Sequence, residues 1–176
     1  MIMNVTKILV PIDYSGQSDR ALQWGASLAE KYGARLLLLH VIPETSEGLS
    51  ESRAERTDPL LPFALDSPAV YRAPSAPEEL MSVDLVEMAQ NDLEDLVIAT
   101  LNERLSVSPT VGVGTPAEEI VRLARDEAVD LIVMGTHGRS GLRHVLLGSV
   151  AETVMRTAPC PVFTVKTAAS PVQGGC

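Results

Sequence analysis

The 176-residue chain has little cysteine and little positive charge. Its two cysteines, Cys160 and Cys176, form no C-x-x-C pair, and this favours an inert thiol, with Cys160 buried, over a redox or metal role. The formal net charge of −9 argues against nucleic acid or an anionic membrane as a partner, because both require a broad basic surface. It does not exclude a small anion held by a local basic loop.

Long apolar runs are also missing. The longest, such as LLLL at 36–39, are far too short to span a bilayer, and the N-terminus MIMNVTKILV lacks the pattern of a signal peptide. We therefore predict a cytoplasmic protein without membrane insertion. The length fits one domain with a sizeable core.

Short apolar segments alternate with helical patterns along the chain. The segments predicted as strands are 7–13, 35–42, 106–114, 130–135 and 161–166. Helical spacing predicts a helix that ends at Gly33, one from 78 to about 104, one that begins at Thr115 and one that begins with Ser149 as its N-cap. This alternation predicts an α/β fold, a single domain over 1–166 whose open parallel sheet carries helices on both faces.

Two segments depart from this alternation. Residues 43–77 hold six of the twelve prolines without a clear period, which predicts a mobile insertion or a lid, and 167–176 is expected to be a flexible tail. Residues 78–104 carry eight acids and one base, most simply on a solvated outer helix face.

Glycine and positive charge gather in one segment, GTHGRSGLRHVLLGS at 135–149, which we call the glycine-rich segment. Its spacing, G-x-x-G-x9-G-[ST], suits a nucleotide. Glycines let backbone N–H groups approach phosphate, and a final Gly-Ser at a helix start adds free N–H groups and a favourable dipole. A plain connecting loop is the alternative, but it does not explain the glycine pairs and the cations together.

Two other glycine patterns are weaker. The segment 112–117 fits the dinucleotide fingerprint G-x-G-x-x-[GA], but no acid ends the following strand at 130–135 to bind a ribose hydroxyl. The segment 15–19 matches the SGGxDS phosphate loop only in part, and no Walker A sequence occurs.

Three stretches carry a family resemblance: KILVPID, the turn Gly114-Thr-Pro-Ala, and GTHGRSGLRHVLLGSVAETVMRTAPCPVFTVK. Through them the chain resembles the universal stress proteins over nearly its whole length, apart from 43–77 and the tail. The resemblance implies a Rossmann-like sheet of five parallel strands in the order 3-2-1-4-5, of the adenine nucleotide alpha hydrolase type. It also implies the ATP-binding branch, which G-x-x-G-x9-G-[ST] marks, and a homodimer through strand 161–166.

The resemblance also assigns nucleotide-binding positions. On the nucleoside side it implies contacts from Pro11, Asp13, Val41, Met134 and Gly135. On the phosphate side it implies Gly138, Gly148, Ser149 and Val150, to which His137 and Arg139 add charge-assisted contacts.

We therefore expect a stress-response protein that binds ATP, with Mg²⁺ or Mn²⁺ carried by the phosphates, and that signals to a regulatory protein partner. No acid lies inside the glycine-rich segment to act as a general base, so efficient hydrolysis is not predicted. Two alternatives stay open: a slow ATPase or nucleotide hydrolase gated by 43–77, and a partner-binding scaffold without a nucleotide role.

Overall fold

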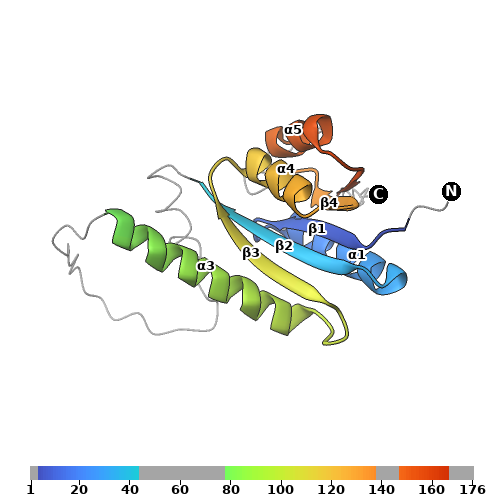
Figure 1. Ribbon diagram of the computed structural model, residues 1–176, viewed down its shortest axis with the longest axis horizontal. Helices are drawn as coiled ribbons and strands as arrows, with labels where there is room; N and C mark the ends of the chain where they lie inside the picture. Colours follow the sequence, from blue (N-terminus) through green and yellow to red (C-terminus); the bar gives the residue numbers. More distant parts are fainter. Residues whose placement is uncertain (1–3, 44–77, 138–146, 167–176) are drawn as a thin grey trace, which may run out of the picture.

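The computed structural model describes residues 4–43, 78–137 and 147–166, and within them five parallel strands form one sheet in the order β3-β2-β1-β4-β5 (Figure 1). The strands are β1 Lys7–Ile12, β2 Arg35–Ile42, β3 Val107–Val113, β4 Leu131–Gly135 and β5 Val162–Val165. The helices are α1 Gly16–Tyr32, α3 Glu78–Thr100, α4 Pro116–Asp126 and α5 Ser149–Thr157. The predicted α/β fold and strand order are confirmed. The expectations for 44–77 and the tail lie outside the described residues.

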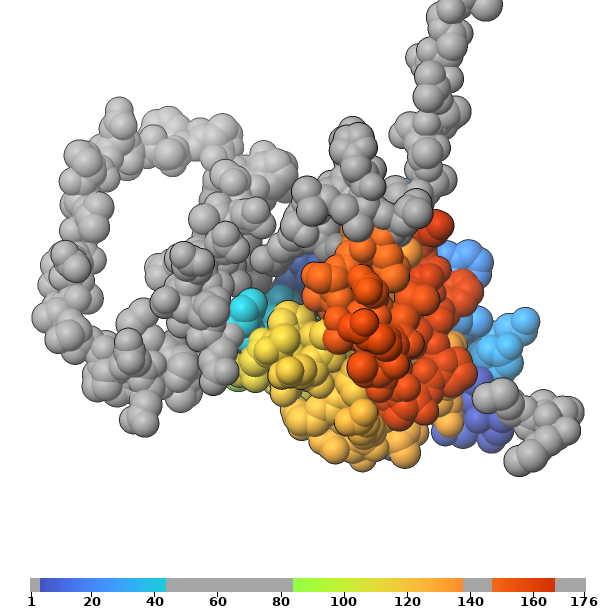
Figure 2. All heavy atoms as spheres, turned by 90° about the horizontal axis from the view of Figure 1, so that it is seen from above, coloured from blue at the N-terminus to red at the C-terminus, as the bar shows by residue number. Residues whose placement is uncertain are grey.

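Helices cover both faces of the sheet, so the central strands β1, β2 and β4 are largely buried on both sides. In β1, Ile8 and Val10 pack in the core beneath α1 and α3, whereas Leu9 packs in the core beneath α4 and α5. Figure 2 looks onto the second of these faces, where α4 (yellow to orange) and α5 (orange-red) lie side by side. Apolar runs without polar alternation are what a strand covered on both faces requires.

Helix α1 is capped at both ends. Its N-cap Ser15 accepts a hydrogen bond from the Ser18 N–H, and Gly33 ends the helix in the left-handed conformation, with φ 65°. A Cβ on Gly25 would lie 2.5 Å from Val10 Cγ2, so this glycine lets α1 lie close against β1. The helix is therefore held firmly over the strand that ends at the candidate site.

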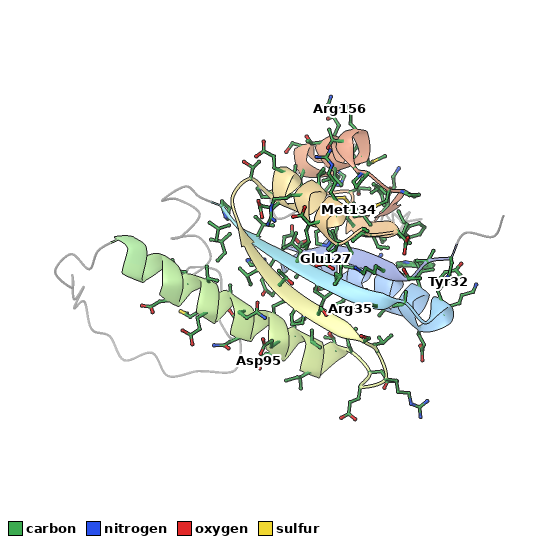
Figure 3. The ribbon with its side chains drawn as sticks, viewed as in Figure 1. Tyr32, Arg35, Asp95, Glu127, Met134 and Arg156 are labelled. Atoms are coloured by element: carbon green, nitrogen blue, oxygen red, sulfur yellow. The ribbon has the colours of Figure 1, made fainter. Side chains whose placement is uncertain are left out.

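Helix α3 carries the acidic surface that the composition predicts. The exposed carboxylates among its described side chains are Asp84, Glu87, Glu94 and Asp95. Figure 3 shows Asp95 on the side of α3 that faces away from the sheet, while Leu93 is fully buried against it. The charge thus decorates a solvated face.

Neighbouring apolar side chains of the edge strand β5 differ in exposure. Val165 is only 6% exposed and points into the core, so it offers no apolar surface to a partner. Phe163 is 40% exposed, and its ring lies 5.7 Å from that of Trp24, which is itself 52% exposed. Trp24 and Phe163 thus form an exposed aromatic pair beside the edge strand.

Candidate functional site

A cavity of about 340 Å³ opens at the carboxyl edge of the sheet, within the range of about 300–1,000 Å³ typical of small-molecule sites. It lies where the strand order reverses, since β1 is flanked by β2 on one side and β4 on the other. The ends of these strands and the first turns of α4 and α5 form its wall.

Most of the residues predicted from the resemblance lie together around this cavity. They are Pro11, Asp13, Val41, Met134, Gly135, His137, Gly148, Ser149 and Val150. Figure 3 shows Met134 between the sheet and the helices α4 and α5. The other two predicted residues, Gly138 and Arg139, lie outside the described residues. The contact of each with a nucleotide stays a prediction.

The same wall contains residues that the sequence reasoning missed: Ile12, Ser18, Leu39, Pro116, Ile120, Thr136 and Ala151. Two signals could have found some of them. Leu39 precedes Val41 by two positions, so both side chains lie on one face of β2. Pro116 and Ile120 are four residues apart, on one side of α4.

Asp13 is held by the residues that begin α1. Its Oδ1 accepts hydrogen bonds from the Ser15 backbone N–H at 3.0 Å and from the Ser15 hydroxyl at 2.6 Å. The Ser15 Oγ in turn accepts from the Ser18 N–H at 3.3 Å. This half-buried carboxylate thus has a backbone amide partner, and Asp13 fixes the start of the helix as well as lining the cavity.

The chain turns sharply after Asp13. Tyr14 has φ 59°, a conformation that costs a non-glycine residue about 1–3 kcal/mol. Its ring packs 4.9 Å from the ring of His40, whose Nδ1 lies 2.8 Å from Ile12 O. His40 is 7% exposed, so it is a hydrogen-bonded histidine of the core. The turn places Asp13 at the cavity and Tyr14 on the opposite face of the sheet.

The glycines at the two ends of the glycine-rich segment allow close packing within the protein. A Cβ on Gly135 would lie 2.9 Å from Gln17 Cβ, and a Cβ on Gly148 would lie 3.2 Å from Thr136 O. The Gly148 N–H donates to that same oxygen at 2.7 Å. Both glycines are therefore required by contacts at the base of the segment, whatever ligand the cavity holds.

The start of α5 corrects one prediction. Ser149 was expected to be the N-cap, but Gly148 occupies that position, with φ −72° and ψ 154°, and Ser149 is the first helical residue. The physical reason is the hydrogen bond from Gly148 N to Thr136 O, which fixes Gly148 in extended backbone. The first N–H groups of α5 have no partners within the helix, and the dipole there favours an anion.

The segment 112–117, which fits the dinucleotide fingerprint, has a packing role in the structure. A Cβ on Gly112 would lie 3.0 Å from Glu119 Oε2, and Gly114 has φ 142°. The Arg122 guanidinium, which bonds to Glu119 at 2.6 Å, holds the pKa of that carboxyl below its usual range. These glycines make room for an ion-paired side chain of α4. Thr115 is the N-cap of α4 as predicted, although its side chain makes no capping hydrogen bond.

Among residues 4–43, 78–137 and 147–166, no three His, Cys, Asp or Glu side chains are grouped so that they could hold a metal ion. Within the same ranges, no helix has the length and apolarity needed to cross a membrane. Of the described residues that line the cavity, Asp13 carries the only carboxylate and His137 the only basic side chain.

Comparison with known proteins gives matches along nearly the whole chain. The model of the universal stress protein family matches residues 4–166. Universal stress protein MJ0577 of Methanocaldococcus jannaschii is 32% identical over 91% of this chain and 94% of its own. A solved structure of hypothetical protein MJ0577 superposes with a TM-score of 0.70 at 31% identity, covering 96% of this chain and all of that one.

A more distant structure was solved with a nucleotide bound. The universal stress protein from Archaeoglobus fulgidus in complex with dAMP has a TM-score of 0.54 at 19% identity, and the match covers 93% of this chain and 100% of that one. At this identity the likeness shows the fold alone.

Proposed function

Because the chain belongs to the universal stress protein family, we propose that its carboxyl-edge cavity binds ATP and that the protein acts as a nucleotide-binding regulator in a stress response. One observation carries the proposal. Residues from β1, β2, β4 and the start of α5, which the family resemblance assigns to nucleotide binding, line a single cavity. The universal stress protein from Archaeoglobus fulgidus, which shares this fold, was solved in complex with dAMP.

The proposed pose follows the wall of the cavity. Val41 meets adenine through its backbone at the end of β2, and Met134 and Gly135 lie along the ribose. Asp13 and Pro11 contact the nucleoside side. The phosphates lie at the start of α5, against Gly148, Ser149, Val150 and, in the segment beyond His137, Gly138 and Arg139. The unpaired N–H groups of the first helical turn supply donors for the phosphate oxygens there.

In this proposal the metal enters with the nucleotide. Mg²⁺ prefers phosphate and water oxygens to a dedicated protein cage, and Asp13, the single carboxylate among the described cavity residues, is hydrogen-bonded to Ser15. The same engagement of Asp13 leaves it poorly placed to activate water. We therefore propose at most slow ATP hydrolysis, which makes nucleotide occupancy a signal for a protein partner.

The proposed oligomer is a homodimer through β5. This strand ends the sheet and pairs only with β4 among the described strands, so one side of its backbone faces outward. Phe163 and Trp24 place an exposed aromatic pair beside this edge, which pairing with a second copy around a two-fold axis would cover.

The proposal is tested by nucleotide content and by a matched pair of variants. Purified protein is denatured, released nucleotide is identified, and thermal unfolding is measured with ATP, GTP, cAMP and dAMP. Val150→Trp fills the cavity, whereas Glu152→Trp adds the same ring on an exposed position of the same helix. ATP should stabilise the parent and Glu152→Trp, and leave Val150→Trp unchanged. Equal stabilisation of all three would place the ligand elsewhere.

A further inference from the structure

The sheet has a second edge at β3, on the side opposite to β5. Among the described strands β3 pairs only with β2, so one side of its backbone faces outward. Unpaired N–H and C=O groups along such an edge can pair with a strand of another molecule. The residues that present these groups therefore decide whether a second copy of the chain can add there.

The hydrogen bonds to β2 identify those residues. Leu36 N donates to Ser106 O at 2.8 Å, and Gly114 N donates to Ile42 O at 3.0 Å. In a parallel pair, the residues of an edge strand that bond to its neighbour alternate with residues whose backbone groups face away. The residues of β3 whose backbone faces outward are therefore Val107, Pro109, Val111 and Val113.

Pro109 removes a donor from the middle of this edge. Proline has no backbone N–H, so only its carbonyl group could bond to an added strand. The Pro109 oxygen already accepts a hydrogen bond from Gln90 Nε2 of α3 at 3.4 Å, which is a long and weak bond. Gln90 Nε2 also donates to Glu94 Oε1 at 2.8 Å. Because a carboxylate only accepts, this second bond keeps the nitrogen of the Gln90 amide toward both oxygens.

Packing holds Gln90 at the edge. Figure 1 shows α3 (green) running beside β3 (yellow), and the two elements are in contact. Leu93, one turn after Gln90, is fully buried in the core that also contains Leu36 and Leu38 of β2. The helix that carries Gln90 is therefore anchored to the sheet next to Pro109.

The edge at β5 has a different set of backbone groups. Thr136 N donates to Val165 O at 3.2 Å, so the backbone of Val165 faces β4. The same alternation leaves Val162 and Thr164 facing outward, and each has both an N–H and a C=O. The outward side of β5 therefore keeps every donor and acceptor that pairing requires.

We infer that Pro109 and Gln90 close the β3 edge to strand addition, so that a second copy of this chain is directed to β5. A strand laid against β3 would find no donor at Pro109, and its own N–H would compete with Gln90 for a single carbonyl. Two open edges would let molecules join head to tail without end, whereas one open edge gives a closed pair. The pair at β5 rests on the proposed dimer, but the closure of β3 does not.

The test restores the missing groups in the full-length protein. Pro109→Val supplies an N–H, and Gln90→Ala frees the carbonyl. Light scattering on the double variant should show species of about twofold the mass of the parent or more, growing with concentration. Hydrogen exchange followed by NMR should show that the new N–H at position 109 is protected in these species. Pro109→Val alone should associate in the same way but more weakly, and it decides the question if the double variant does not fold.

Thr110→Val is the matched control, because it adds a valine to the same strand at a position whose backbone faces β2. It should keep the mass of the parent. Unchanged mass in the Pro109→Val variants, or an equal gain in Thr110→Val, would overturn the inference. Association without protection at position 109 would also overturn it, since the contact would lie elsewhere. A monomeric parent would refute the proposed dimer, while comparison of each variant with that parent would still decide the role of Pro109 and Gln90.

Discussion

Substitution of Gly148 by alanine tests why glycine is required at the base of the glycine-rich segment. The new Cβ would lie 3.2 Å from Thr136 O and 3.5 Å from His137 Cα, and neither backbone atom can rotate away. Relief of this contact must lengthen the 2.7 Å hydrogen bond from Gly148 N to Thr136 O. Because φ is −72°, alanine adopts the backbone conformation without strain, and the cost comes from the contact.

The magnitude follows from two effects. Forcing extra volume into packed structure costs about 1–3 kcal/mol, and weakening one hydrogen bond costs up to about 1 kcal/mol. We expect Gly148→Ala to lower the free energy of unfolding by about 2 kcal/mol and Tm by about 4–8 °C. The shifted start of α5 should also weaken ATP binding by at least about tenfold, as measured by calorimetric titration.

Two further variants isolate the cause. Gly16→Ala meets no atom within 4 Å, so it should raise stability by about 0.4–1 kcal/mol and leave ATP affinity unchanged. Gly148→Ser supplies a good N-cap residue, so it would stabilise α5 if capping dominated. We expect it to destabilise as alanine does. The reasoning fails if Gly148→Ala matches Gly16→Ala in both Tm and affinity.

Three other outcomes follow from the structure. Phe163→Asp should convert the proposed dimer to a monomer in light scattering while ATP binding persists. Tyr32→Asp, at another exposed aromatic residue, should leave the dimer intact. A monomeric parent would contradict the proposed dimer. Hydrogen bonds from Thr6 hold the pKa of Asp130 below its usual value, so its stabilisation is full above the unfolded-state pKa of about 3.9 and is lost as pH falls through the lower folded-state pKa. Asp130→Asn should therefore destabilise at pH 7 and lose that effect in strong acid, and denaturant unfolding that shows a pH-independent difference would argue against this. Phosphate release from ATP should stay far below the enzyme median of about 10 s⁻¹, and release near that rate would favour an enzyme.

The strands were predictable because a buried strand leaves a local signal in the sequence, a run of consecutive apolar residues. The run RLLLLHVI at 35–42 coincides with β2, since a strand covered on both faces needs apolar residues at successive positions. The cavity wall was predicted only where the family resemblance assigns a residue to it. The glycine pattern identified Gly135 and Gly148, and it pointed to nucleotide binding as the reason for both.

The remaining features depend on contacts between distant segments. Gln17 contacts both Gly135 and His137, which are more than a hundred residues away in the sequence. No local sequence pattern predicts either contact. The N-cap of α5 is Gly148, one residue before the predicted Ser149, because the Gly148 N–H donates to Thr136 O. A prediction based on the preference for serine at N-caps contains no information about this bond. Trp24 is exposed because it lies on α1 beside the edge strand β5. The two are neighbours only because of the order of the strands in the sheet.

The central claim, that the carboxyl-edge cavity binds ATP, is tested most directly by calorimetric titration of the full-length protein with ATP after removal of any co-purified nucleotide. The account predicts a dissociation constant on the order of micromolar, which corresponds to about −8 kcal/mol. Absence of both binding heat and any thermal stabilisation at millimolar ATP would contradict it.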